Sequence, residues 1–163
     1  LCSNGRLEST LILPPPGLGK TTLLRDLIRL VSDGTGCLPL RVSVADERGE
    51  IAALWNGVPQ LEVGRNTDVM EGCPKAQGLM LLLRAMNPQV LAADEITAPE
   101  DAAALRTAFG CGVTLLATAH GGDKSDLERR ALYRPLLEEG CFHWLVRIVR
   151  GPEGRRYFTE ELT

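Results

Sequence analysis

The sequence has little of what several classes of protein need. Two Trp, two Tyr and three Phe among 163 residues do not indicate aromatic platforms for single-stranded nucleic acid. Two histidines and five cysteines, with no C-x-x-C pair, argue against a zinc site or a disulfide scaffold. No apolar run approaches the roughly 20 residues of a membrane span, and no secretory signal opens the chain. We therefore expect a reduced chain in the cytoplasm.

The net charge and the length of the chain narrow the possible class of protein further. A net charge of −3 argues against a strongly basic nucleic-acid groove, although it does not exclude a local patch. A length of 163 residues fits one domain with a single core. The chain begins at Leu1, a few residues before the first apolar strand. We expect residues 1–163 to be one domain, excised from a longer protein and lacking its N-terminal domain.

A phosphate-binding loop is indicated between an apolar β-type run, residues 9–13, and a helical pattern, residues 21–31. A strand, a glycine turn and Gly-Lys-Thr at a helix start form the context that such a loop requires. Glycine lets the backbone approach an anion, and N–H groups at the helix start then bind phosphate. The residues assigned to nucleotide binding are Gly17, Leu18, Gly19, Lys20, Thr21 and Thr22.

Two of these residues have specific expected roles. Lys20 is expected to reach the β- and γ-phosphates of ATP, and the Thr21 hydroxyl to ligate Mg²⁺. Pro14 stands where the full motif G-x-x-x-x-G-K-[ST] has glycine. Three consecutive prolines lack N–H groups, so donors to phosphate must come from Gly17 onward. The alternative, a Pro/Gly turn with an incidental lysine, does not explain the strand and helix on either side.

A second acidic motif follows another apolar strand. Residues 89–93 lead directly into Asp94 and Glu95. Asp94 is expected to hold Mg²⁺ through its water shell, and Glu95 to orient or deprotonate the attacking water. Pairs of carboxylates also occur in ordinary surface turns. The preceding phosphate loop in an alternating β/α chain favours the functional interpretation.

Two more strands deliver polar residues at their carboxyl ends, the edge where open parallel sheets bind ligands. Residues 40–45 lead into the charged segment 46–50, which includes Glu47. Residues 113–117 lead to His120. The segment 46–50 is a ligand loop or a solvated loop, and His120 is a γ-phosphate sensor or a structural histidine.

The rest of the chain is expected to complete an α/β domain. Residues 51–71 read as a long loop with one short helical turn, and helices are expected at 76–86, 99–109 and 123–133. Residues 142–150 and 155–159 predict a terminal hairpin. Its arginines form either a solvated face or a contact to a partner or phosphate. They are Arg147, Arg150, Arg155 and Arg156.

Four separated blocks resemble the stage III sporulation protein AA family, and together they cover nearly the entire chain. They are residues 15–27, 46–51, 73–76 and 118–121. The resemblance implies a RecA/AAA-like P-loop ATPase related to the hexameric ATPases of type II and type IV secretion. It implies a three-layer α/β/α fold with a parallel sheet in the order 5-1-4-3-2. It also implies hydrolysis of ATP with Mg²⁺ and ring assembly at the inner face of a membrane complex serving spore development.

The resemblance also suggests residue roles. Glu47 resembles the acidic-box glutamate of secretion ATPases, and His120 resembles their histidine box. Arg65 and Arg84 sit where those ATPases carry arginines that touch nucleotide within or across subunits. Glu95 and Glu47 both remain candidates for the general base, and we favour Glu95.

Three functions are consistent with the sequence. The favoured one is a motor ATPase of a secretion-like sporulation complex. The others are a nucleic-acid-dependent P-loop ATPase and a nucleotide-binding structural subunit without turnover.

Overall fold

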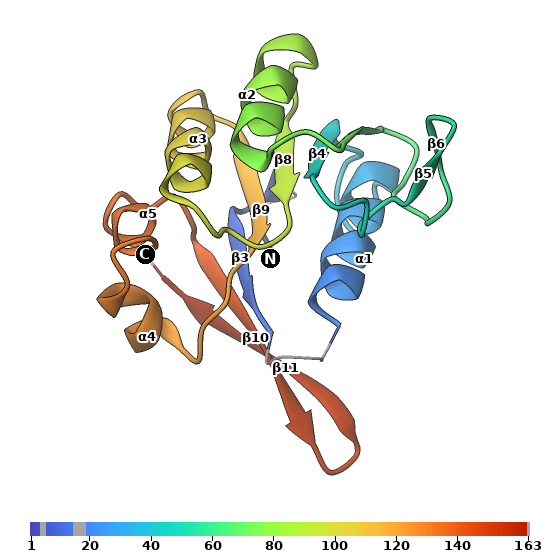
Figure 1. Ribbon diagram of the computed structural model, residues 1–163. Helices are drawn as coiled ribbons and strands as arrows, with labels where there is room; N and C mark the ends of the chain where they lie inside the picture. Colours follow the sequence, from blue (N-terminus) through green and yellow to red (C-terminus); the bar gives the residue numbers. More distant parts are fainter. Residues whose placement is uncertain (4–5, 15–18, 163) are drawn as a thin grey trace.

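The computed structural model describes residues 1–3, 6–14 and 19–162. A seven-stranded sheet runs through its centre in the order β11-β10-β3-β9-β8-β4-β7 (Figure 1). The strands pair in parallel from β10 to β7, whereas β11 pairs with β10 in antiparallel fashion. The strand bounds are β3 (Thr10–Leu13), β4 (Val42–Asp46), β7 (Thr67–Glu71), β8 (Val90–Ala93), β9 (Thr114–Thr118), β10 (Trp144–Gly151) and β11 (Gly154–Glu161).

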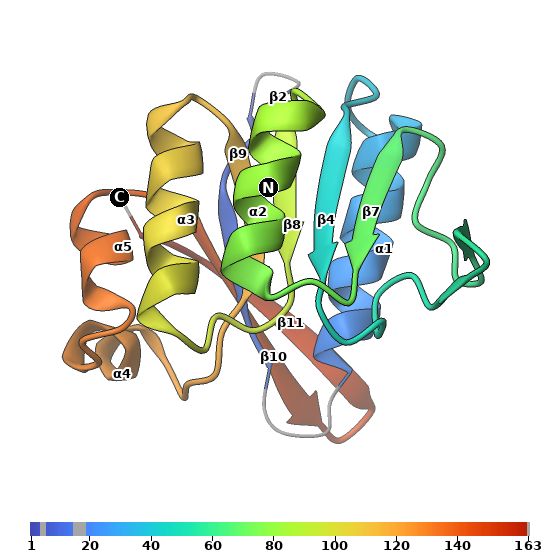
Figure 2. The same cartoon turned by 45° about the horizontal axis from the view of Figure 1, so that its top comes forward.

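This topology confirms the expected fold. The five strands expected from the sequence are β3, β4, β8, β9 and β10, and they lie in the expected order 5-1-4-3-2. The C-terminal hairpin is also confirmed, and it projects beyond the sheet on the side where α1 begins (Figures 1 and 2). A separate small pair, β1 (Cys2–Ser3) and β2 (Arg6–Leu7), precedes the sheet.

Helices cover both faces of the sheet and create three layers (Figure 2). Helix α1 (Lys20–Asp33) packs on one face, with Leu24 and Ile28 fully buried. Helices α2 (Lys75–Ala85) and α3 (Pro99–Gly110) pack on the other face, and α4 (Lys124–Arg129) and α5 (Arg134–Glu138) extend that core. Burying each large aliphatic side chain contributes about 1.5–3 kcal/mol.

The segment 51–71 is more ordered than the sequence suggested. It contains a short hairpin of β5 (Leu54–Trp55) and β6 (Val58–Pro59), and then β7, which pairs with β4 at the sheet edge. Expecting a loop throughout this segment was therefore wrong. Strand β7 places Val69 in the α1 core and Met70 in the α2 core. Its polar residues and half-burial, ordinary for an edge strand, hide the pattern.

The expected helix at 123–133 is also shorter in the structure. Helix α4 ends at Arg129, and a turn follows before α5. The turn buries Tyr133, whose hydroxyl donates a hydrogen bond of 2.9 Å to the carbonyl of Ile96. A continuous helix was therefore the wrong expectation, because a distant carbonyl fixes the chain direction here.

None of the helices in the described part of the chain has both the length and the apolar content that crossing a bilayer demands.

The segment before β7 docks tightly against the end of α1. The Asn66 amide donates to Ser32 Oγ at 2.7 Å, and the Arg65 amide donates to Asp33 Oδ1 at 2.9 Å. Gly64 has a φ of +90°, and a Cβ there would lie 2.5 Å from Ser32 Cβ and 3.1 Å from the Arg29 carbonyl oxygen. Both neighbours belong to the helix and cannot move aside, so only glycine fits.

Gly64→Ala is therefore expected to destabilise the protein by about 2 kcal/mol or more, because overpacking and backbone strain act together. Gly57→Ala is the matched control, since Gly57 has a φ of +78° with no atom within 4 Å of the added Cβ. It should cost only about 1 kcal/mol from the backbone. Urea unfolding of both variants compares the two costs, and equal losses would contradict the packing argument.

Candidate active site

The parallel strands bring distant parts of the sequence to one edge of the sheet. Strands β3, β4, β8 and β9 all end there, as parallel neighbours must. The residues that follow these ends, or terminate them, include most of the expected site residues. They are Lys20 and Thr21 after β3, Asp46 and Glu47 at β4, Asp94 and Glu95 after β8, and Thr118 and His120 at β9.

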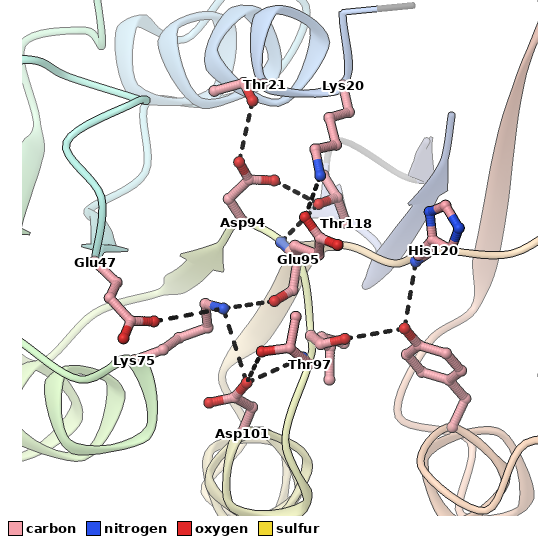
Figure 3. A network of polar contacts seen from close by, with 12 residues as sticks. Lys20, Thr21, Glu47, Lys75, Asp94, Glu95, Thr97, Asp101, Thr118 and His120 are labelled. Atoms are coloured by element: carbon pink, nitrogen blue, oxygen red, sulfur yellow. Dashed lines mark hydrogen bonds and ion pairs between the residues drawn. The ribbon is translucent and has the colours of Figure 1, made fainter. Parts of the chain in front are cut away.

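The start of α1 contacts the end of β8 directly. Thr21 Oγ1 donates to Asp94 Oδ2 at 3.0 Å, and Lys20 Nζ forms an ion pair with Glu95 Oε2 (Figure 3). Gly19 precedes the helix in the left-handed conformation, with a φ of 74°. The structure thus joins the lysine, the hydroxyl and both carboxylates that the sequence assigned to this site.

The other residues assigned to nucleotide binding are Gly17, Leu18, Gly19 and Thr22. Thr22 lies exposed on the first turn of α1. Gly17 and Leu18 lie outside the described residues. A Cβ placed on Gly19 would meet the Arg155 guanidinium at 3.0–3.2 Å. An arginine from the terminal hairpin therefore covers the start of α1, a position that its sequence context did not reveal.

Thr118 connects the two acidic residues. Its hydroxyl donates to Asp94 Oδ1 at 2.6 Å and accepts a hydrogen bond of 2.7 Å from the Glu95 amide. The side chain is fully buried at the end of β9. The role of Thr118 was not expected from the sequence, because its contact with Glu95 spans 23 positions.

Glu95 has an unusual backbone and a perturbed carboxyl group. Its φ of 39° lies in the left-handed region, which is uncommon for a residue with a side chain. The hydrogen bond from Lys20 lowers the pKa of Glu95, partial burial opposes this, and the charges of Lys20, Arg48 and His120 lower it further. The carboxylate is therefore ionised at neutral pH.

Two carboxylates lie next to each other at the end of β4, and they differ in burial. Asp46 is buried and accepts hydrogen bonds of 2.9–3.0 Å from the amides of Glu50, Ile51 and Ala52. Those bonds shape the loop that follows. Glu47 is exposed, and its carboxylate lies 3.8 Å from Lys75 Nζ. Of the two, Glu47 is the one that solvent and ligand can reach.

Lys75 lies in the block 73–76 that resembles the family, but no role was expected for it from the sequence. It begins α2, and its ammonium donates to the Glu95 carbonyl at 2.5 Å and lies 3.8 Å from the Asp101 carboxylate. Asp101 Oδ2 also accepts from the amides of Thr97 and Ala98 at 3.1 Å, which caps α3. A small cleft, with room for water of about 40 Å³, opens beside this network between the ends of β4 and β8.

His120 lies at the same edge with its backbone held in place. The His120 amide donates to the Tyr133 hydroxyl at 3.3 Å, and Arg130 donates to the His120 carbonyl at 3.0 Å. The residue is exposed, and its charge contributes to lowering the pKa of Glu95. It therefore lies near the acidic pair, where a ligand could meet its ring.

Arg65 and Arg84 are not brought to this edge. Arg65 precedes β7 and docks at the end of α1, and Arg84 is exposed in the last turn of α2. Because α1 and α2 both begin at the site edge, their last turns lie at the opposite, amino-terminal edge of the sheet. Within one chain neither arginine reaches Lys20 or Glu95.

Lys20→Met is expected to raise the pKa of Glu95, because the largest cause of lowering is removed while burial remains. In the wild type, the lowered pKa of Glu95 means that the ion pair stabilises the fold at pH values above the ordinary carboxyl pKa of 4.5. That contribution is lost as the pH falls through the lowered pKa. Carboxylate NMR titration of Glu95 tests this, with Lys124→Met as the control, and an unchanged titration in Lys20→Met would contradict it.

Solved structures with a similar fold include secretion and pilus ATPases. The VirB11 ATPase of the Brucella suis type IV secretion system matches 94% of this chain with a TM-score of 0.64 and 16% identity. The pilus retraction motor PilT, solved with bound ADP, matches 95% with a TM-score of 0.63 and 16% identity. This chain covers 48% and 47% of those two chains. At this level of identity the likeness shows only the shared α/β fold.

Sequence relatives give the family. Stage III sporulation protein AA of Bacillus subtilis (strain 168) is 46% identical over 143 residues, which are 87% of this chain and 47% of that protein. The protein SEEDLING PLASTID DEVELOPMENT 1 of Arabidopsis thaliana is 33% identical over 69% of this chain and 16% of its own length. This chain thus spans about half the length of the Bacillus protein, at 47%, and 16% of the Arabidopsis protein. The family profile described as "Sporulation stage III, protein AA" matches residues 1–155, and the chain belongs to that family.

Proposed function

We propose that this chain binds ATP with Mg²⁺ and hydrolyses it, as the motor of a secretion-like complex that serves sporulation. The contacts of Lys20 with Glu95 and of Thr21 with Asp94 support this most directly. A lysine, a hydroxyl and two carboxylates at one sheet edge are the groups that bind phosphates, hold Mg²⁺ and activate water. The family and the fold of the solved neighbours point to the same chemistry.

The donor set fits a magnesium ion. Thr21 and Asp94 supply hard oxygen ligands, and Mg²⁺ in such sites uses one or two protein ligands with water and phosphate. Their oxygens lie 3.0 Å apart, so both can face one ion. The ion, when bound, neutralises charge on the β- and γ-phosphates.

Lys20 links phosphate binding to the basicity of the Glu95 carboxylate. Its ammonium pairs with Glu95 in the structure, and a phosphate group would compete for it. Release from Lys20 removes the main cause that lowers the pKa of Glu95. The carboxylate then becomes a stronger base when substrate is present, as proton abstraction from water requires.

Glu95 is better placed than Glu47 to act as that base. Glu95 contacts Lys20 and adjoins Asp94, whereas Glu47 lies next to Lys75, one strand farther from β3. We assign Glu95 the proton transfer and Glu47 a supporting charge. His120, on the other side of Glu95, is assigned to sense the γ-phosphate.

The proposed motor is an assembly of several copies, a hexameric ring in the full-length protein, at the inner face of a membrane complex. The positions of Arg65 and Arg84 support contacts between copies. Both are exposed at the sheet edge opposite Lys20, so either could reach nucleotide only from a neighbour. An arginine supplied across subunits can contribute about 10³–10⁵ in rate.

Lys20→Ala in the full-length protein should abolish ATP binding, because it removes the ammonium that contacts phosphate, while the fold is kept.

Glu95→Gln should bind ATP with Mg²⁺ normally but hydrolyse it at least about 10²-fold more slowly. Glu47→Gln should lose less. Calorimetric titration and single-turnover hydrolysis measure both properties. If Lys20→Ala binds ATP as tightly as wild type, the assignment of the nucleotide site is refuted. If wild type binds ATP but does not hydrolyse it, the protein is a nucleotide-binding structural subunit without turnover.

Mixing variants tests the contacts between copies. Full-length Lys20→Ala and Arg65→Ala should each hydrolyse ATP poorly alone, and their mixture should recover activity. In the mixture an intact Arg65 faces an intact nucleotide site at some interfaces. The same holds for Arg84→Ala, and a mixture with Lys124→Ala serves as the control for dilution. If no mixture exceeds its components, neither arginine acts across subunits.

A further inference from the structure

We infer that Lys75 is a positioning residue that holds the backbone of Glu95 and so aims its carboxylate. The inference rests on the proposed ATPase function, for which Lys75 has so far no role. It starts from four segments that meet at one ammonium group. They are the start of α2, the residue after Asp94, the loop after β4 and the start of α3 (Figure 3).

The contacts of Lys75 are unequal, and the closest one is to a backbone atom. Nζ donates to the Glu95 carbonyl at 2.5 Å, whereas the carboxylates of Glu47 and Asp101 lie at 3.8 Å. The carbonyl is therefore the direct partner. The two carboxylates balance the charge of the ammonium but lie too far from it to compete with the Glu95 carbonyl for its hydrogen bond.

The position of Lys75 is energetically unfavourable for a charged side chain. Lys75 is 8% exposed, and it is the only buried lysine or arginine in the described part of the chain. It also stands at the start of a helix, where the macrodipole disfavours a positive charge. Burial of an ammonium is tolerated when oxygen partners surround it. Stability alone would be served as well by an apolar side chain.

What the lysine secures is the strained backbone of Glu95. A φ of 39° is rare for glutamate and persists only where the surroundings enforce it. Both backbone polar groups of Glu95 are bound by side chains. Thr118 accepts from its amide at 2.7 Å, and Lys75 donates to its carbonyl at 2.5 Å. The residue is held from both sides of its Cα.

This arrangement matters when substrate replaces Glu95 as the partner of Lys20. The Glu95 carboxylate then loses its ion pair, but Thr118 and Lys75 still fix the backbone. The carboxylate can turn toward a water only by side-chain rotation from a fixed Cα. Without Lys75 the backbone relaxes and the carboxylate is misaimed. Binding through Lys20 and Thr21 is unaffected, whereas proton transfer slows.

The test compares Lys75→Met, Lys75→Arg and Lys124→Met in the full-length protein. Lys124 is a matched control, because it also begins a helix, α4, but contacts none of these residues. We measure ATP affinity with Mg²⁺, single-turnover hydrolysis, and hydrogen exchange of the Glu95 amide in nucleotide-free protein. The last measurement needs neither ATP nor metal.

Lys75→Met is expected to bind ATP within about twofold of wild type and to hydrolyse it at least about 10-fold more slowly, since misaiming forfeits part of the 10²–10⁴ that a positioned base provides. Its Glu95 amide should exchange at least about 10-fold faster, with β3 amides unchanged. Lys75→Arg should recover part of both losses, and Lys124→Met should match wild type.

Three results would overturn the inference. They are wild-type hydrolysis in Lys75→Met, an unchanged exchange rate at Glu95, or a joint loss of ATP affinity and of exchange protection across the sheet. The third would give Lys75 a purely structural role. If wild type itself fails to hydrolyse ATP, the proposed function fails, and the exchange measurement still decides whether Lys75 holds Glu95.

Discussion

The parallel pairing of β3, β9, β8 and β4 is the constraint on which the rest of the structure depends. Parallel strands must end at the same edge, so residues that are more than 70 positions apart, such as Thr21 and Asp94, meet there. The helices that return the chain lie on the two faces and leave this edge open. Polar groups therefore gather where the strands stop, and several of them, such as Asp46 and Thr118, are buried there against one another and the backbone.

At that edge the chain pairs its own opposite charges. Lys20 and Glu95 pair with each other, so neither is left as an uncompensated charge in a half-buried site. In the proposed function, a bound phosphate would compete for Lys20 and leave Glu95 ionised and unpaired. The exchange of partners would then couple binding to the basicity of the carboxylate.

The fold was largely predictable, and the site was partly so. Alternating apolar strands and helices with a Gly-Lys-Thr turn indicate an α/β fold, and the order of the sheet was expected from the family resemblance. Asp94 and Glu95 stand out because they end an apolar run. Strand β7 did not stand out, because Thr67 and Asp68 conceal an edge strand that is only half buried. Lys75 and Thr118 were missed for another reason. Their roles depend on contacts with Glu95 across 20 and 23 positions of sequence, which no local pattern encodes.

The two edges of the sheet suggest how one chain depends on another. The site edge carries its own cations, Lys20 and Arg48, while Arg65 and Arg84 are anchored at the far edge by the ends of α1 and α2. No rotation of an exposed side chain spans the length of a helix of 11 or 14 residues, which is about 16–21 Å. If these arginines contact nucleotide at all, the far edge of one copy must face the site edge of the next. Head-to-tail contacts of that kind form a ring when the rotation between copies closes, and a ring is the assembly proposed for this motor.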